Sequence, residues 1–317
     1  LIRGEMAFDH KFVPDFVLAR ADGSPLYTLA VAVDDILMKV THILRGEDLL
    51  SSTPRQIRVY QAMGVAIEDY PVFAHLPFVM GADNAKLSKR NGEVSIAWYR
   101  DKGFLPEAIC NYLALLGWSP GDDRENVTMK ELCELFTVEK VNGSPARFDM
   151  KKLEAINGDK IRALTIDEFL KWTLPFLIKA NVISGTDSEI DLVKRALPII
   201  QERIVMFSEV PAMLKFLFVK DFAIEADSLA KVTDSSAKDV LKRSLKELEP
   251  LGEWTHERIE AALRSSLIED MGLKPRIAFG AVRIATTGST ISPPLFESME
   301  LLGKEASLSR ISTALAL

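Results

Sequence analysis

The sequence is poor in cysteine and in long apolar runs. Its 317 residues include two cysteines, Cys110 and Cys133, and no C-x-x-C pair. Both lie in helix-like apolar patterns, so we expect buried thiols in a reducing compartment rather than a disulfide framework. No apolar run approaches the roughly 18 residues of a membrane span, and no signal-peptide pattern follows Leu1. These absences favour a soluble, cytoplasmic protein.

The chain also lacks an excess of positive charge. Its net charge is −6, and acidic side chains outnumber basic ones on both sides of residue 160. A nucleic acid would therefore have to be bound by local cationic patches and not by the field of the whole molecule. Apolar residues make up 48% and charged residues 26%, which excludes collagen-like, mucin-like and largely disordered chains and fits two or three folded domains.

Several functional motifs are absent as well. The sequence has no G-x-x-x-x-G-K-[ST], G-x-G-x-x-G or G-x-S-x-G motif, which argues against a P-loop ATPase, a common dinucleotide oxidoreductase and an α/β-hydrolase. We interpret Asp34-Asp35 as a turn and not as an acid–base pair, because Asp readily bonds its own backbone in turns. The four histidines lack the spacing of metal ligands, so we expect no metal site and no zinc. They are His10, His42, His75 and His256.

In the first hundred residues, short apolar and β-branched runs alternate with turn residues. Asp22-Gly23 is typical of a hairpin turn. Thr53 can cap a helix whose first turn contains Pro54, and Gly64 suits the end of that helix. The expected elements are strands over 16–20, 26–33, 40–45 and 72–76 and a helix over 53–64.

From residue 94 onward the pattern is helical almost throughout. Thr128–Glu131 and Thr165–Glu168 have capping-box spacing, and Asp149 can cap a helix over 150–156. Other expected helices cover 106–116, 188–206, 210–218, 235–248, 255–267, 275–286 and 294–302. The fold class is therefore α/β followed by all-α, and we place the domains at 1–160 and 161–317, with a soft boundary near 150–165.

The most distinctive segment is Lys86-Leu87-Ser88-Lys89-Arg90, which places three cations within five residues between two glycines, Gly81 and Gly92. Lysine ammonium groups can neutralise the charge that develops on a phosphoryl group, and the glycines allow the backbone to approach a ligand. This pattern predicts a polyphosphate-binding loop. The alternative is a solvated basic loop without a ligand.

Arg45 follows an apolar strand and precedes Gly46-Glu47-Asp48. An arginine at a strand end can bind a carboxylate through a two-pronged fork, or it can form a structural ion pair with Glu47 or Asp48. Tyr27 lies in the neighbouring strand-like run, where its phenol can bind a ligand or its ring can pack in the core. Both remain candidate ligand-binding residues.

Taken together, these segments resemble the glutamyl-tRNA synthetases, a branch of the class I aminoacyl-tRNA synthetases. Lys86–Arg90 is similar to the second signature motif of class I, K-M-S-K-S, which is commonly K-L-S-K-R in this branch. The resemblance covers essentially the whole chain. The other segments that carry it are Tyr27–Ala30, Asp34-Asp35, Thr41–Asp48, Ser52–Gln56, Asn111–Trp118, Phe148–Leu153, Pro275–Gly288 and Ser292–Leu295.

The resemblance implies a role for each domain. Residues 1–160 would form the C-terminal half of a Rossmann-like catalytic domain together with a region that contacts the tRNA stem. Residues 161–317 would form a helical anticodon-binding domain. Arg203 is then a candidate reader of the third anticodon base.

The resemblance also implies roles for individual side chains of the first domain. Lys86 and Lys89 would be catalytic, and Lys89 would bind ATP together with Ser88. Tyr27 and Arg45 match positions that bind glutamate, with Arg45 holding the side-chain carboxylate.

The reaction implied by the resemblance has two steps. Glutamate attacks the α-phosphate of ATP to give glutamyl-adenylate and pyrophosphate, and the acyl group then passes to a ribose hydroxyl of the terminal adenosine of the tRNA. Magnesium accompanies ATP through phosphate oxygens and water. The expected partners are tRNA(Glu), L-glutamate and ATP with Mg²⁺, with no membrane and a monomeric chain.

The sequence departs from the family pattern in two places. Val31 stands where many members carry an asparagine, and a valine cannot donate that hydrogen bond. The first signature motif, H-x-G-H, is absent, which agrees with a chain that starts at Leu1 in the middle of a domain. We expect this chain alone to bind tRNA without making adenylate.

Other functions fit this sequence less well. The main alternative is a non-catalytic, tRNA-binding remnant of a synthetase, against which the retained lysine motif argues. A glutaminyl enzyme would have a β-rich anticodon region, and a related tRNA-modifying enzyme would lack the helical half.

Overall fold

The computed structural model describes all residues of the chain except 10, 12, 82–85, 88–94 and 220–221. The chain divides into two units, one of residues 1–98 and 106–156 and one of residues 99–105 and 157–317. Two of the three divisions fall inside helices, α3 (Ile96–Lys102) and α6 (Met150–Arg162), and the third directly precedes Pro106. The domain limits expected from the sequence, 1–160 and 161–317, stay a prediction.

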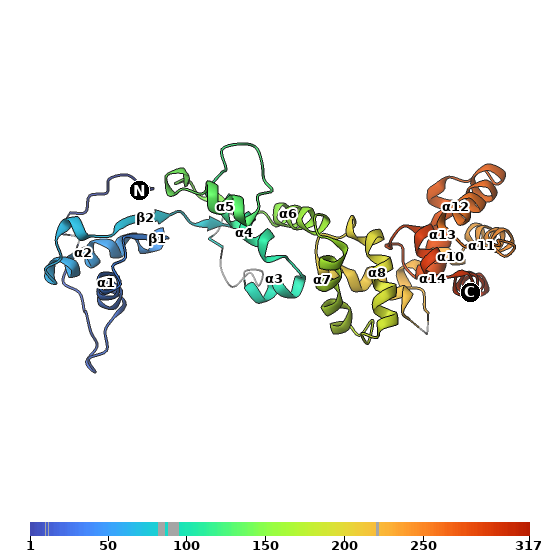
Figure 1. The fold of residues 1–317 in the computed structure, drawn as a ribbon, viewed down its shortest axis with the longest axis horizontal. Coiled ribbons are helices and arrows are strands. Elements are labelled where there is room, and N and C mark those ends of the chain that lie inside the picture. Colours follow the sequence, from blue (N-terminus) through green and yellow to red (C-terminus); the bar gives the residue numbers. More distant parts are fainter. Residues whose placement is uncertain (10, 12, 82–85, 88–94, 220–221) are drawn as a thin grey trace. The chain divides into compact units, whose positions relative to one another are not determined.

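The first unit begins with a β-α-β arrangement. Strand β1 (His42–Gly46) pairs in parallel with β2 (Val72–Leu76), and helix α2 (Thr53–Ala62) lies between them in the chain (Figure 1). A parallel pair needs such a crossover because the chain must return to the same end of the sheet. Two short 3₁₀ helices complete the connection, Glu47–Ser52 and Ile67–Asp69.

The segment expected as a strand over 26–33 is instead part of helix α1 (Tyr27–Leu37). Leu29, Ala32 and Ile36 share one face of this helix and pack in a cluster with residues of α2. Tyr60 of α2 donates a hydrogen bond to Asp35 at 3.2 Å. The interpretation of Asp34-Asp35 as a turn was therefore also wrong, because both residues are helical.

The other elements expected in residues 16–76 are confirmed in whole or in part. The turn at Asp22-Gly23 is present, with Gly23 at a positive φ of 84°, but the flanking strands are reduced to one bridge between Ala19 and Pro25. The strands over 40–45 and 72–76 are confirmed as β1 and β2. Helix α2 is confirmed too, although Ser52 occupies its cap position and Thr53 is its first helical residue.

The rest of the first unit surrounds a second parallel pair, β3 (Val79–Met80) with β4 (Ala146–Arg147). Its helices α4 (Pro106–Leu115) and α5 (Met129–Leu135) are joined by a loop that side chains fix in place. Asn111 donates to the carbonyl of Glu125 at 2.9 Å and accepts from the amide of Val127 at 2.8 Å. A further 3₁₀ helix covers Val138–Lys140.

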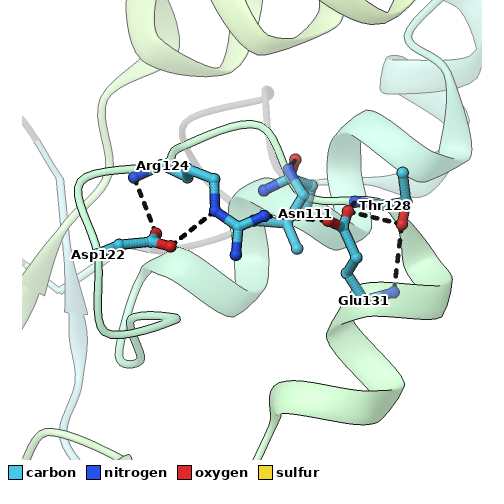
Figure 2. Close-up of polar contacts among 6 residues, drawn as sticks. Asn111, Asp122, Arg124, Thr128 and Glu131 are labelled. Carbon is cyan, nitrogen blue, oxygen red and sulfur yellow. Dashed lines mark hydrogen bonds and ion pairs between the residues drawn. The ribbon is translucent and has the colours of Figure 1, made fainter.

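Charged side chains of the same loop complete this arrangement. Figure 2 shows Arg124 against Asp122, with Thr128 and Glu131 forming the expected capping box. Arg124 also donates to Glu131 at 3.0 Å. The loop is thereby tied to the first turn of α5.

The expectation that both cysteines are buried is wrong. Cys110 on α4 and Cys133 on α5 are free but exposed, not buried. The buried residues Ala108, Asn111 and Tyr112 share one face of α4, whereas Cys110 and the exposed Leu113 lie on another. Apolar residues therefore occur on both faces, and their pattern did not identify the solvent side.

The second unit is helical, and no strand is assigned to its described residues. The expected helices are present as α8, α9 and α11 to α14, and the capping box at Thr165 opens α7. The helix expected over 188–206 ends at Gln201, and the one expected over 210–218 divides into α9 and a short 3₁₀ helix. Helices α10 and α15 were not predicted. The helices are α7 (Ile166–Lys179), α8 (Asp187–Gln201), α9 (Val210–Leu214), α10 (Ala226–Thr233), α11 (Ser235–Leu248), α12 (His256–Leu263), α13 (Pro275–Thr287), α14 (Leu295–Leu302) and α15 (Lys304–Ala316), with short 3₁₀ helices at Phe207–Glu209 and Lys215–Leu217 and a π-helix at Arg264–Asp270.

A buried arginine organises part of this helical unit. Arg310 of α15 donates to the carbonyl oxygens of Thr286 at 2.8 Å and Phe216 at 2.9 Å. Its guanidinium lies 4.1 Å from the ring centre of Phe222. Burial lowers the pKa of Arg310 to about 10. The side chain thus joins three segments that are distant in the sequence.

Among the helices that the structure describes, none is both long enough and apolar enough to cross a membrane.

Candidate functional site

Arg45 lies near the end of β1, and its guanidinium is held by three hydrogen bonds. Nε donates to Nε2 of His75 at 3.2 Å, and Nη2 donates to Oγ1 of Thr53 at 2.8 Å and to the carbonyl of Leu49 at 3.3 Å. The guanidinium carbon lies 5.5 Å from the ring centre of Phe73. All four partners belong to the β1–α2–β2 arrangement, so the fold itself fixes the arginine.

The hydrogen-bond acceptors among these partners are neutral, so the expected ion pair of Arg45 with Glu47 or Asp48 is not formed, and the binding of a carboxylate stays a prediction. Glu47 pairs instead with Arg3, and Asp48 pairs with Lys86. Within the described part of the chain, Nη1 of Arg45 makes no hydrogen bond, so its two N–H groups can face an anionic ligand. Because Nε and Nη2 already have partners, a carboxylate would meet Nη1 and not the two-pronged fork expected from the sequence.

A carboxyl group lies in the electrostatic range of this arginine. Burial raises the pKa of Asp35, while the hydrogen bond from Tyr60 and the charge of Arg45 act in the opposite direction. Asp35 is therefore part of the same electrostatic environment.

Tyr27 is the first residue of α1 and is 51% exposed, so it is neither in a strand nor in the core. Val31 lies four residues later, and side chains at this spacing share one face of a helix. The phenol of Tyr27 is thus accessible to a ligand. Its role in binding glutamate stays a prediction.

Lys86 is anchored beside β3. It forms a bridge with Met80, and the amide of Leu87 donates to the carbonyl of Val79 at 3.0 Å. The ammonium group of Lys86 lies 3.6 Å from Oδ2 of Asp48 and 4.0 Å from the ring centre of Phe78. Ser88 and Lys89, the other expected ATP-binding residues, lie outside the described residues.

The segment after Arg45 is joined to the segment that leads to Lys86. Glu47 accepts a hydrogen bond from the amide of Phe78 at 3.2 Å, and Asp48 faces Lys86. Two of the predicted site residues therefore lie on connected segments.

The sequence did not predict that His75 and Thr53 contact Arg45. It also did not predict that Asp48 and Phe78 contact Lys86. The signal for His75 is the strand register, because Arg45 and His75 are directly paired across β1 and β2. That register belongs to the folded sheet and has no local pattern in the sequence.

The second unit contains a group of cations around a cavity of about 760 Å³. Its lining includes Lys231 of α10 and Arg276 and Arg283 of α13. Burial and the charge of Arg203 lower the pKa of Arg283, so Arg203 contributes to the same positive environment. Arg203 is exposed and lies just after the end of α8, not within the helix expected over 188–206.

Among the described residues, no group of three or more His, Cys, Asp or Glu side chains could hold a metal ion.

Comparison with protein families gives two matches. Residues 1–155 match the catalytic domain of class I tRNA synthetases (E and Q), and residues 168–315 match an anticodon binding domain. Together these matches cover both units of the chain.

Individual relatives agree with the family matches. The chain is 49% identical to a glutamate–tRNA ligase of Saccharopolyspora erythraea over 99% of its own length and 64% of the relative. It is 50% identical to a glutamate–tRNA ligase of Paenarthrobacter aurescens, over 98% of its length and 62% of the relative. The chain thus spans slightly less than two thirds of these curated relatives.

Solved structures show the same similarity at the level of the fold. The crystal structure of a glutamate tRNA ligase from Elizabethkingia meningosepticum, in complex with its amino acid, matches with a TM-score of 0.81 and 28% identity, covering 99% of this chain and 64% of the other. A glutamate-tRNA synthetase from Elizabethkingia anophelis matches with a TM-score of 0.80, also at 28% identity, covering 100% of this chain and 65% of the other.

Proposed function

Because the chain belongs to the glutamate–tRNA ligase family of class I aminoacyl-tRNA synthetases, we propose that it serves the ATP-dependent attachment of glutamate to tRNA(Glu) in the cytoplasm. The observation that carries this proposal is Arg45, whose guanidinium is fixed by neutral groups and keeps Nη1 for an anionic side chain. A cation held in this way favours a carboxylate over the amide of glutamine.

The substrates are assigned to the first unit. Arg45 binds the side-chain carboxylate of L-glutamate, and Tyr27 contributes its exposed phenol. Lys86 and Lys89 neutralise the charge that develops on the phosphates of ATP, which enters with Mg²⁺, and Ser88 supports the same loop. Catalysis of the adenylation step is then mainly positioning and charge stabilisation.

The tRNA is assigned partly to the second unit, where the anticodon loop would be bound. Arg203, Arg283, Arg276 and Lys231 supply local positive charge in a chain whose net charge is −6. Single-stranded RNA loops are recognised by hydrogen bonds to splayed bases and by stacking, for which arginine is well suited. Arg203 reads the third anticodon base in this proposal, and the chain acts as a monomer.

A non-catalytic tRNA-binding role is the second candidate, because residues 168–315 match an anticodon binding domain. The two are distinguished by L-glutamate binding, which a tRNA-binding remnant does not need. It is measured on these 317 residues together with tRNA(Glu) binding and glutamate- and tRNA-dependent ATP–pyrophosphate exchange. We expect binding of tRNA(Glu) and of L-glutamate without exchange. Substantial exchange would contradict the expectation for the isolated chain and would exclude the non-catalytic role.

The assignment of Arg45 to L-glutamate binding is tested by a separate substitution. Arg45→Gln should abolish L-glutamate binding while leaving tRNA(Glu) binding unchanged. Arg20→Gln is the matched variant, because Arg20 bonds Ser24 at the exposed turn and has no part in the proposed site. Loss of tRNA binding in the Arg45 variant alone would contradict the assignment.

A further inference from the structure

His75 is the residue that the register of the sheet places beside Arg45. It is 4% exposed, and its Nε2 lies 3.2 Å from Nε of Arg45 and 3.2 Å from Oγ1 of Thr53. Oγ1 of Thr53 in turn lies 2.8 Å from Nη2 of Arg45. The three side chains therefore form a closed triangle of hydrogen bonds.

The chemistry of the triangle fixes the state of the imidazole. Arginine has donors and no acceptor, so Nε2 of His75 has to be an acceptor, with the ring proton on Nδ1. Protonation of Nε2 would place one N–H group against another. Burial and the charge of Arg45 lower the pKa of His75, in agreement with a neutral ring.

The remaining contacts restrict the orientation of the guanidinium plane of Arg45. Phe73 and His75 lie two residues apart on β2, and their rings are nearly parallel, with 6° between the planes. Arg45 lies over the ring of Phe73 while His75, Thr53 and Leu49 contact its edges. Rotation that moved Nη1 away would break two or more of these contacts together.

We propose that His75 is a positioning residue: as a neutral acceptor it holds the guanidinium of Arg45 so that Nη1 faces the side chain of the bound amino acid. The inference rests on the proposed glutamate-binding function of Arg45. A glutamine amide can meet Nη1 only through its oxygen, which is neutral, whereas either oxygen of a carboxylate accepts with a negative charge and forms the stronger contact. His75 thereby contributes to the preference for a carboxylate, although it need not touch the substrate.

If His75 only filled space in the core, its side chain would need a suitable size but no hydrogen-bond acceptor. Packing against Phe73 needs a group of suitable size, and leucine would largely meet that need. Positioning needs an acceptor at the place of Nε2, which glutamine can supply and leucine cannot. The pair His75→Gln and His75→Leu therefore separates the two roles.

The binding experiment measures the affinity of the 317-residue chain for L-glutamate and L-glutamine, with urea unfolding followed by circular dichroism as the check that each variant is folded. We expect His75→Leu to weaken L-glutamate binding about tenfold or more, as for loss of a hydrogen bond to a charged group, and to reduce the preference over L-glutamine. His75→Gln should retain most of both. His42→Leu is the matched control, because His42 is an exposed histidine of the same strand pair.

The inference is overturned if His75→Leu keeps the affinity and preference of the unaltered chain, or if the Gln and Leu variants lose both equally while unfolding in urea like the unaltered chain. A second measurement is independent of the ligand: the NMR coupling between Nε of Arg45 and Nε2 of His75 across their hydrogen bond. Its absence would also overturn the inference. If the unaltered chain shows the coupling but no L-glutamate binding, the positioning of Arg45 stands and the proposed glutamate-binding function is the part that fails.

Discussion

Oδ2 of Asp48 lies 3.6 Å from the ammonium group of Lys86, so the segment that follows Arg45 is paired with the first residue of the lysine motif. Both side chains are more than half exposed. An exposed pair of this kind contributes little to stability, typically about 0–1 kcal/mol. Its effect on the binding of anions by Lys86 is therefore easier to detect than its effect on folding.

Removing the charge of Asp48 should strengthen phosphate binding. In Asp48→Asn, Lys86 keeps its contact with Phe78 but loses a competing carboxylate, so affinity for inorganic tripolyphosphate should rise by about threefold, the scale of an exposed ion pair. Calorimetric titration at low and high salt measures this, and the gain should shrink as salt screens the charges. Glu134→Gln is a matched control, since Glu134 pairs with Lys130 elsewhere in the same unit. Equal gains in both variants would exclude a specific role for Asp48.

Loss of Lys89 should impair adenylate formation and leave tRNA binding nearly unchanged. In a form of the protein that makes adenylate, Lys89→Ala should lower the rate of ATP–pyrophosphate exchange by at least about a hundredfold, because a charge that stabilises the transition state is lost. Affinity for tRNA(Glu) should change little, since the anticodon contacts are assigned to the second unit. Filter binding measures the affinity. An equal loss of exchange and of tRNA affinity would contradict the assigned role.

Features with a local physical cause could be predicted from the sequence. The capping boxes at Thr128 and Thr165 each need two residues three positions apart, and both are formed. Strand β1 and helix α2 also have local signals, namely an apolar, β-branched run over 40–45 and a proline in the first helical turn.

Features that depend on tertiary packing could not be predicted in the same way. The run from Leu26 to Val33 has the composition of a strand, but Leu29 and Ala32 pack on α2 from a helix. A short apolar run has no periodicity that separates the two structures, so the partner decides. The site follows the same rule: Arg45 was a candidate from its own neighbours, whereas His75 joins it through strand register.

The buried arginine of the second unit provides a test of stability. Arg310→Met removes the donors to Thr286 and Phe216 and leaves two carbonyl groups without these partners, so the free energy of unfolding should fall by about 2–4 kcal/mol. Urea denaturation followed by circular dichroism measures the change. Arg258→Met is the matched control, because Arg258 forms an exposed ion pair with Glu253 and should change stability by less than about 0.5 kcal/mol. Similar losses in the two variants would show that the buried contacts of Arg310 are not special.

The final prediction concerns the pH dependence of stability through His256, at the start of α12. Nδ1 of His256 lies 2.6 Å from Oε2 of Glu300. That hydrogen bond, together with the charges of Glu257, Glu300 and Glu297, raises the pKa of His256 above its ordinary value of 6.5, and partial burial opposes the rise. Because the folded state binds the proton more tightly than the unfolded state, the stabilisation is fully present below about pH 6.5 and is lost as the pH rises through the higher, folded-state pKa.

The measurement for His256 is the difference in unfolding free energy between the unaltered chain and His256→Asn, taken at several pH values. The difference should be larger at pH 5.5 than at pH 8.5, because only the protonated ring pairs with Glu300. His42→Asn controls for the loss of a histidine as such, since the ring of His42 forms its hydrogen bond with Thr41 and not with a carboxylate. A difference that is constant with pH, or that grows toward alkaline pH, would mean that the contact between His256 and Glu300 does not carry a charge in the folded protein.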